Sequence, residues 1–163
     1  MIDAQTRALA EQVLAACRTR KWTVATAESC TGGLVAGALT EIAGSSDVVD
    51  RGLVTYSNAA KVSLLGVSEA TLAAHGAVSR QTAEAMAQGA LARSGVDLTV
   101  AITGVAGPGG GSVEKPVGLV HFAAAASDGR LIHREKRYGD VGRSEVRRLS
   151  VMEAMNLLLE LAS

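Results

Sequence analysis

Aromatic residues, cysteine and proline are all scarce in this sequence of 163 residues. It contains one tryptophan, two tyrosines, one phenylalanine, two cysteines and two prolines. Cys17 and Cys30 form neither a disulfide framework nor a zinc-binding pattern, so we expect two free thiols in a reducing compartment. The apolar residues make up 48% of the chain and are mainly alanine, valine and leucine. Their small side chains favour close packing of helices against a sheet.

Excess charge of one sign and long apolar runs are also missing. Lysine plus arginine and aspartate plus glutamate number 16 each, so no broad field is available to hold a nucleic acid. A local basic cluster at Arg143, Arg147 and Arg148 is sufficient for one phosphate. The apolar runs near 100–102 and 122–126 are too short to cross a bilayer. Because the first residues do not resemble a signal peptide, we expect a cytoplasmic protein without a membrane partner.

Apolar spacing and capping residues predict helices that alternate with strands in the first part of the chain, followed by a hairpin. Helices are expected over 4–19, 34–42, 58–65, 69–75, 80–94 and 143–161. Strands are expected over 22–27, within 48–56, and over 98–102, 117–126 and 131–138. The pattern indicates a single α/β domain over 1–163, a three-layer α/β/α arrangement with a mixed sheet.

Residues 27–33, AESCTGG, lie where the first predicted strand is followed by a helix. Ser29 would point its hydroxyl out of the sheet edge, and the next backbone N–H groups would be free to hold an oxyanion or a phosphate. Simple helix capping by Ser29 or Thr31 is an equally good interpretation. Cys30 is a rival nucleophile, although small buried cysteines are more often inert. The candidate ligand contacts of this turn are Cys30, Thr31, Gly32 and Gly33.

Tyr56 and Lys61 form a second candidate pair, at a strand end and in the first turn of the next helix. The positive helix N-terminus disfavours an ammonium group there, which would help Lys61 act as a base, with Tyr56 relaying the proton. An exposed lysine and a half-buried tyrosine are the plainer alternative. Short-chain dehydrogenases separate their Tyr and Lys by three residues, whereas four intervene here. No Gly-x-Gly-x-x-Gly follows the first strand either, which argues against an oxidoreductase.

The glycine-rich segment 102–112, ITGVAGPGGGS, follows a predicted buried strand. It lacks the Gly-Lys-Ser/Thr of a Walker phosphate loop. Thr103 and Gly104 fall at the carboxyl end of the strand, where open sheets bind ligands. We expect a functional flap over 103–116, the alternative being an ordinary mobile loop. His75, His121 and His133 show no metal-ligand spacing, so we expect no metal.

Five stretches together resemble the C-terminal domain of the competence/damage-inducible CinA proteins. They cover nearly the whole chain in order, which makes the resemblance far more specific than any single motif. The stretches are AESCTGG at 27–33, VTYSN at 54–58 with Lys61, HGAVS at 75–79, TGVAGPGG at 103–110 and EKPVG at 114–118.

The resemblance implies hydrolysis of the carboxamide of nicotinamide mononucleotide to nicotinate mononucleotide and ammonia, without a metal or an organic cofactor. Ser29 then corresponds to the nucleophile, Tyr56 and Lys61 to its activating pair, and Thr103 with Gly104 to the ligand-contacting loop. Full-length CinA proteins carry a further N-terminal domain, so the resemblance implies a stand-alone form.

The sequence departs from the family pattern at 139–143, GDVGR. The family places an arginine directly after Gly-Asp, whereas two residues intervene here. Either Arg143 or Arg147 is therefore expected to hold the substrate phosphate. A non-catalytic nucleotide-binding or phosphate-binding module and a serine amidohydrolase for another amide remain as alternatives. The small-residue helices also allow a homodimer.

Overall fold

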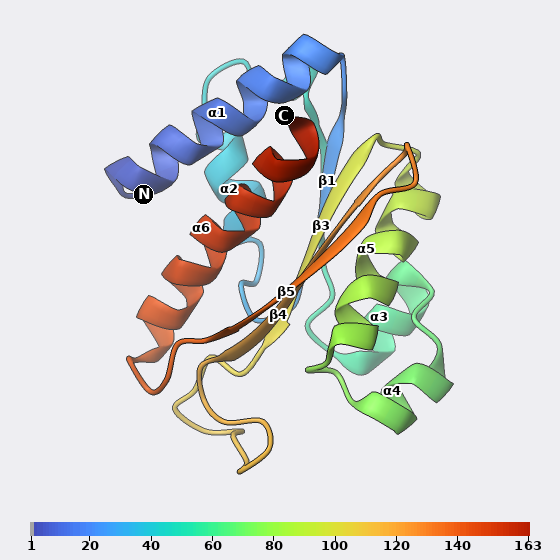
Figure 1. Cartoon of the computed structure of the whole chain (residues 1–163), viewed down its shortest axis with the longest axis vertical. Helices are drawn as coiled ribbons and strands as arrows, with labels where there is room; N and C mark the ends of the chain where they lie inside the picture. The colour runs from blue at the N-terminus through green and yellow to red at the C-terminus, as the bar shows by residue number, and fades with distance from the viewer. Residues whose placement is uncertain (1) are drawn as a thin grey trace.

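The computed structural model describes residues 2–163 and shows one five-stranded sheet between two layers of helices (Figure 1). The strands are β1 (Val24–Glu28), β2 (Val49–Val54), β3 (Leu98–Gly104), β4 (Leu119–Ala126) and β5 (Leu131–Arg137). The helices are α1 (Ala4–Arg20), α2 (Leu34–Thr40), α3 (Asn58–Leu65), α4 (Glu69–His75), α5 (Arg80–Ser94) and α6 (Arg143–Ala162), with a short 3₁₀ turn, η1 (Ser45–Asp47).

The strands are arranged in the order β2-β1-β3-β4-β5. β1 runs parallel to β2 and β3, whereas β4 and β5 are antiparallel to their neighbours, so the sheet is mixed. Glu28, the last residue of β1, pairs with Val54 on one side and with Ile102 on the other. Because the three parallel strands end at the same edge, the residues that follow them converge there.

The two faces of the sheet carry different cores. α1, α2 and α6 cover one face, and α3, α4 and α5 lie on the other (Figure 1). Alternation along β4 sends Phe122 to the first face and Ala123 to the second. The second core is built largely of alanine, which lets α5 approach the sheet closely.

The predicted α/β class, with a mixed sheet between helical layers, is confirmed. The boundaries differ in detail: β1 begins at Val24 rather than at Trp22, and α2 ends at Thr40. Thr103 and Gly104, expected in a loop, belong to β3 because they continue its pairing with β4. Among residues 2–163, no helix has the length and apolar character needed to cross a bilayer.

Candidate functional site

The turn between β1 and α2 is organised by Glu28, whose side chain is fully buried. Its carboxylate accepts hydrogen bonds from the N–H groups of Val35 (2.9 Å) and Ala36 (3.0 Å), in the first turn of α2. It also accepts from the hydroxyls of Thr31 (2.7 Å) and Thr26 (3.1 Å). A carboxylate at a positive helix N-terminus is favourable, and four donors compensate for its burial. Glu28 therefore caps α2 from within the protein.

This cap decides between the two interpretations of the turn. Neither Ser29 nor Thr31 caps α2, because Gly33 occupies the cap position without a side-chain bond and Glu28 binds the free N–H groups. The Ser29 hydroxyl is consequently not used by the helix. From the sequence alone, Glu28 could either orient Lys61 or Ser29 or make a structural hydrogen bond, and the structure shows the structural role. That this role is a helix cap was not predicted, although an acidic residue just before a helix is a recognisable signal.

Lys61 lies in the first turn of α3, which Ser57 caps by accepting from the Ala60 N–H. Its Nζ donates to Ser29 Oγ at 2.9 Å and to the main-chain oxygen of Thr55 at 2.8 Å. The residue is 1% exposed. Burial lowers the pKa of its ammonium group below the ordinary 10.5. Desolvation, rather than the helix terminus that the sequence suggested, is thus the main reason why the neutral amine becomes accessible.

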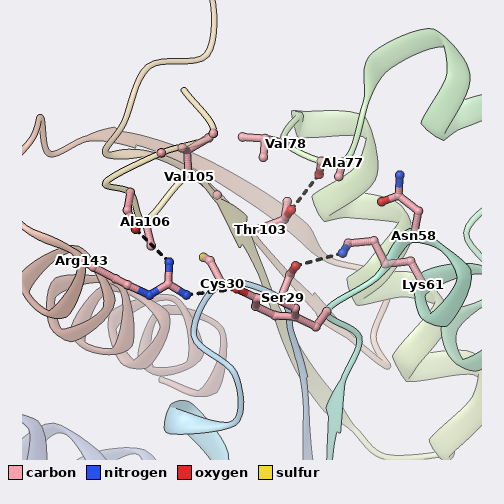
Figure 2. A pocket seen from close by; sticks show the side chains of 15 residues that line it. Ser29, Cys30, Asn58, Lys61, Ala77, Val78, Thr103, Val105, Ala106 and Arg143 are labelled. Atoms are coloured by element: carbon pink, nitrogen blue, oxygen red, sulfur yellow. Dashed lines mark hydrogen bonds between the residues drawn. The ribbon is translucent and has the colours of Figure 1, made fainter. Parts of the chain in front are cut away.

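A cavity of about 290 Å³ opens over this pair. Figure 2 shows Lys61 and Arg143 entering it from opposite sides, with Ser29 and Cys30 between them. The sequence predicted that segments distant along the chain would meet here. The lining residues are Ser29, Cys30, Tyr56, Asn58, Lys61, Ala77, Val78, Thr103, Gly104, Val105, Ala106, Gly107, Gly109, Gly110 and Arg143.

Tyr56 is placed differently from the expected proton relay. Its side chain is 62% exposed, and its hydroxyl accepts from Arg143 Nη2 at 3.0 Å. Among residues 2–163 its hydroxyl has no hydrogen bond with Lys61 or Ser29, which already contact each other directly. Arg143 Nη1 also donates to the Gly107 oxygen at 2.9 Å. Arg143 therefore joins the Tyr56 side of the pocket to the glycine-rich loop.

Arg147 lies one turn further along α6 and outside the cavity lining. Its guanidinium donates to the main-chain oxygens of Cys30 (3.2 Å) and Thr31 (3.3 Å). These two hydrogen bonds of Arg147 hold the β1–α2 turn against α6. Of the two candidate arginines, Arg143 is the one that faces the pocket.

The backbone of the turn offers fewer free donors than the sequence suggested. The Gly32 N–H bonds the Ser29 oxygen, and the Leu34 N–H bonds the Thr31 oxygen. Thr31, Gly32 and Gly33, all expected to contact substrate, do not line the cavity. The N–H groups of Cys30, Thr31 and Gly33 have no hydrogen-bond acceptor within 2–163, and of these residues Cys30 is the one that lines the cavity beside Ser29.

Thr103 and Gly104 line the cavity as expected, but each also holds structure together. The Thr103 hydroxyl donates to the Ala77 oxygen at 2.7 Å, which ties β3 to the segment before α5. A Cβ atom at Gly104 would come within 2.7 Å of Val120 Cγ2 and 2.8 Å of the Leu119 oxygen. Glycine is needed at this point because β4 passes so closely.

Cys30 fits an inert thiol better than a nucleophile. It is 6% exposed. Desolvation raises the pKa of its thiol to about 12, which leaves very little thiolate near neutrality. No group of three or more metal-ligating side chains occurs in the part of the chain that the structure describes.

The fold and this site define a class: an α/β protein with a buried lysine beside a serine at the carboxyl edge of a mixed sheet. A family model, the CinA C-terminal domain, matches residues 6–162. The chain belongs to the CinA C-terminal domain family.

Relatives and solved structures agree with this assignment. The chain is 51% identical to the nicotinamide-nucleotide amidohydrolase PncC of Escherichia coli K12 over 97% of this chain and 95% of that protein. It is 56% identical to a CinA-like protein of Synechococcus over 92% of this chain, which is 36% of that protein's length. The crystal structure of the competence/damage inducible protein CihA from Agrobacterium tumefaciens superposes with a TM-score of 0.98 at 55% identity, covering 100% and 99% of the two chains.

Proposed function

We propose that this protein is a nicotinamide-nucleotide amidohydrolase that releases ammonia from the carboxamide of nicotinamide mononucleotide. The observation that carries the proposal is the buried Lys61 amine 2.9 Å from the Ser29 hydroxyl at the floor of a cavity. A serine needs such a base partner to attack an amide near neutral pH. The similarity to PncC along almost the full length of both chains supports the substrate.

The chemistry starts with neutral Lys61, whose amine takes the proton from Ser29 Oγ. The oxygen attacks the carboxamide carbon, and the Cys30 N–H stabilises the oxyanion that forms. Lys61 then delivers its proton to the amide nitrogen, the C–N bond breaks and ammonia leaves. Water, activated in turn by Lys61, hydrolyses the acyl-enzyme to nicotinate mononucleotide and returns the proton to Ser29.

Arg143 is proposed to hold the phosphate of the substrate. It enters the cavity from the side opposite Lys61, which places the phosphate away from the reacting carboxamide (Figure 2). Its guanidinium presents a planar fork suited to phosphate oxygens. Tyr56, bonded to Arg143, is assigned to positioning this arginine rather than to proton transfer.

Ammonia release from nicotinamide mononucleotide tests the proposal. Ser29→Ala and Lys61→Met should each reduce turnover by about 10³-fold or more, because each removes one half of the nucleophile and its base. Ser63→Ala, on the exposed side of α3, and Lys136→Met, on β5, are matched controls that should keep full activity. Full turnover by Ser29→Ala would overturn the mechanism.

The two alternatives give different results in the same assay. A non-catalytic nucleotide-binding module would bind nicotinamide mononucleotide and release no ammonia. An amidohydrolase that does not use the phosphate would hydrolyse free nicotinamide about as fast as the nucleotide, whereas the proposed enzyme should strongly favour the nucleotide.

A further inference from the structure

A second cavity, of about 230 Å³, lies on the other side of the segment that joins α4 to α5. Val78 lines both this cavity and the one over Ser29 and Lys61, called the Ser29 pocket from here on. The second cavity is formed where the HGAVS stretch at 75–79 meets the EKPVG stretch at 114–118. Both stretches carry the resemblance to the family, yet the proposed reaction uses neither of them beyond Ala77 and Val78.

Cations reach this cavity from three separate elements. Arg80 comes from the start of α5, Lys115 from the glycine-rich loop and Arg137 from the end of β5. One carboxylate, that of Glu114, is also among the lining residues. The lining therefore carries three cations and one carboxylate, and two further carboxylates outside it, Glu84 and Glu135, pair with Arg80 and Arg137. A ligand with several anionic oxygens could contact all three cations.

Of the three cations, Lys115 has the most N–H donors left for a ligand. Lys115 Nζ donates to the His75 oxygen at 2.6 Å and has no carboxylate within ion-pair distance in the described part of the chain. Two of its three N–H donors are thus free. Arg80 and Arg137 hold exposed ion pairs with Glu84 (2.8 Å) and Glu135 (2.7 Å), which contribute little and can rearrange.

A hydrogen-bonded histidine pair adjoins this cavity, with His121 buried in its lining and His133 half-buried. His121 Nδ1 and His133 Nε2 are hydrogen-bonded at 2.9 Å across β4 and β5. His121 lines the cavity and is 8% exposed, and its second ring nitrogen has no hydrogen-bond partner within 2–163. Among residues 2–163 the fully buried side-chain polar atom without a partner is Thr55 Oγ1, so this His121 nitrogen is open to solvent and can contact a ligand in the cavity.

We propose that this second cavity is a binding site for a phosphate group, held by Lys115, Arg80 and Arg137 above His121. A tetrahedral anion can offer a separate oxygen to each cation, whereas a planar carboxylate has two oxygens for the same set. The proposal concerns residues outside the Ser29 pocket and does not depend on the amidohydrolase activity.

Phosphate binding should change the titration of the histidine pair. Burial and neighbouring cations lower the pKa of both rings, with His133, Lys115 and Arg137 facing His121 and Arg80 facing His133. Glu135 of β5 acts in the opposite direction on both rings, and Glu84 of α5 does so on His133. A bound phosphate adds negative charge and favours the imidazolium form, so both pKa values should rise when phosphate binds.

Histidine ¹³C–¹H NMR spectra with inorganic phosphate as the probe test this site. We expect saturable shifts of His121 and His133 at constant ionic strength, with acetate binding at least about tenfold more weakly. The double variant Lys115→Met/Arg137→Met should weaken phosphate binding about tenfold or more. The charge-matched double variant Arg51→Met/Lys136→Met should leave it unchanged, because these side chains lie outside the cavity.

Three results would overturn the proposal. They are the absence of a saturable shift in the wild-type protein, equal binding of acetate and phosphate, and unchanged binding by the Lys115→Met/Arg137→Met variant with a wild-type melting temperature. Arg143→Ala should retain the His121 shift, since it alters only the Ser29 pocket. Loss of the shift in that variant would place the phosphate at Arg143 and would also contradict a second site.

Discussion

At the residue scale, the environment of Lys61 controls when Ser29 can react. The ammonium group is removed from water and, among residues 2–163, has no carboxylate within ion-pair distance, so its proton is held less tightly than in solution. The direct contact with Ser29 then makes a separate relay residue unnecessary. The burial of one side chain supplies the base that the chemistry requires.

The pH dependence of the reaction should follow Lys61. Only the neutral amine can accept the Ser29 proton, so the rate should rise with pH and reach a plateau above the pKa of Lys61. Because burial lowers this pKa below 10.5, the rise should be complete at a lower pH than for an exposed lysine. Steady-state ammonia release across pH measures this, with the Ser63→Ala variant as control. A rate that stays flat as Lys61 becomes protonated would contradict its role as the base.

Sequence reasoning anticipated some contacts at this scale and missed others. The expectation that Ser29 and Lys61 meet came from the resemblance to the CinA family. The structure explains the contact, because β1 and β2 are parallel neighbours and each residue follows the carboxyl end of its strand. Sequence reasoning missed the bond between Tyr56 and Arg143 because the two residues are 87 positions apart in the chain. The His121–His133 bond depends on β4–β5 register, which spacing along the chain does not show. The functional roles assigned to the site residues stay predictions.

At the element scale, the position of α3 depends on its contact with α5. A Cβ atom at Gly89 of α5 would lie 1.8 Å from the main-chain oxygen of Leu65, the last residue of α3. This close approach between helices brings the start of α3, and with it Lys61, over the sheet edge. Glycine is required at position 89 for packing, since backbone atoms cannot move aside as a flexible side chain can.

Gly89→Ala should therefore destabilise the protein. Overpacking against backbone is expected to lower the free energy of unfolding by about 1–3 kcal/mol. Gly37→Ala is the matched control, because no heavy atom lies within 4 Å of the added methyl group on α2. Alanine is the better helix former, so the control should gain up to about 1 kcal/mol. Urea unfolding measures both, and equal changes in the two variants would contradict the packing argument.

The longer helices and the strands could be predicted from apolar periodicity, because they bury a face against the sheet. The short helices α3 and α4 were predictable from their capping serines and terminal glycines instead, and α4 contains no buried residue. The ends of the strands and helices near the site were harder to predict. Thr103 and Gly104 suggested a loop, but pairing with β4 extends β3 through both positions. Tertiary hydrogen bonding therefore decided what local propensity could not.

At the scale of the whole molecule, the pocket is assembled from both helical layers. Lys61 comes with α3 on one face of the sheet, and Arg143 begins α6 on the other face (Figure 1). Ser29 lies at the sheet edge between them (Figure 2). Correct packing of both cores is thus required before the pocket exists. The homodimer expected from small-residue helices stays a prediction.

Arg143→Ala should separate phosphate recognition from chemistry. Removing a guanidinium that holds phosphate should raise KM for nicotinamide mononucleotide about tenfold or more, since a charged hydrogen bond contributes about 1.5–3 kcal/mol. Hydrolysis of free nicotinamide, which has no phosphate, should change much less. Steady-state kinetics with both substrates measure the difference, and Arg147→Ala tests the other arginine. Equal losses for both substrates would contradict the assignment.

The capping of α2 by Glu28 has a practical consequence for seeing the substrate in place. Since this helix takes nothing from the neighbouring hydroxyl, an alanine at position 29 should leave the scaffold intact while blocking attack. Crystals of that inert form could be soaked with nicotinamide mononucleotide to capture the uncleaved nucleotide. The electron density would then show which end of the nucleotide lies beside Lys61 and which lies beside Arg143.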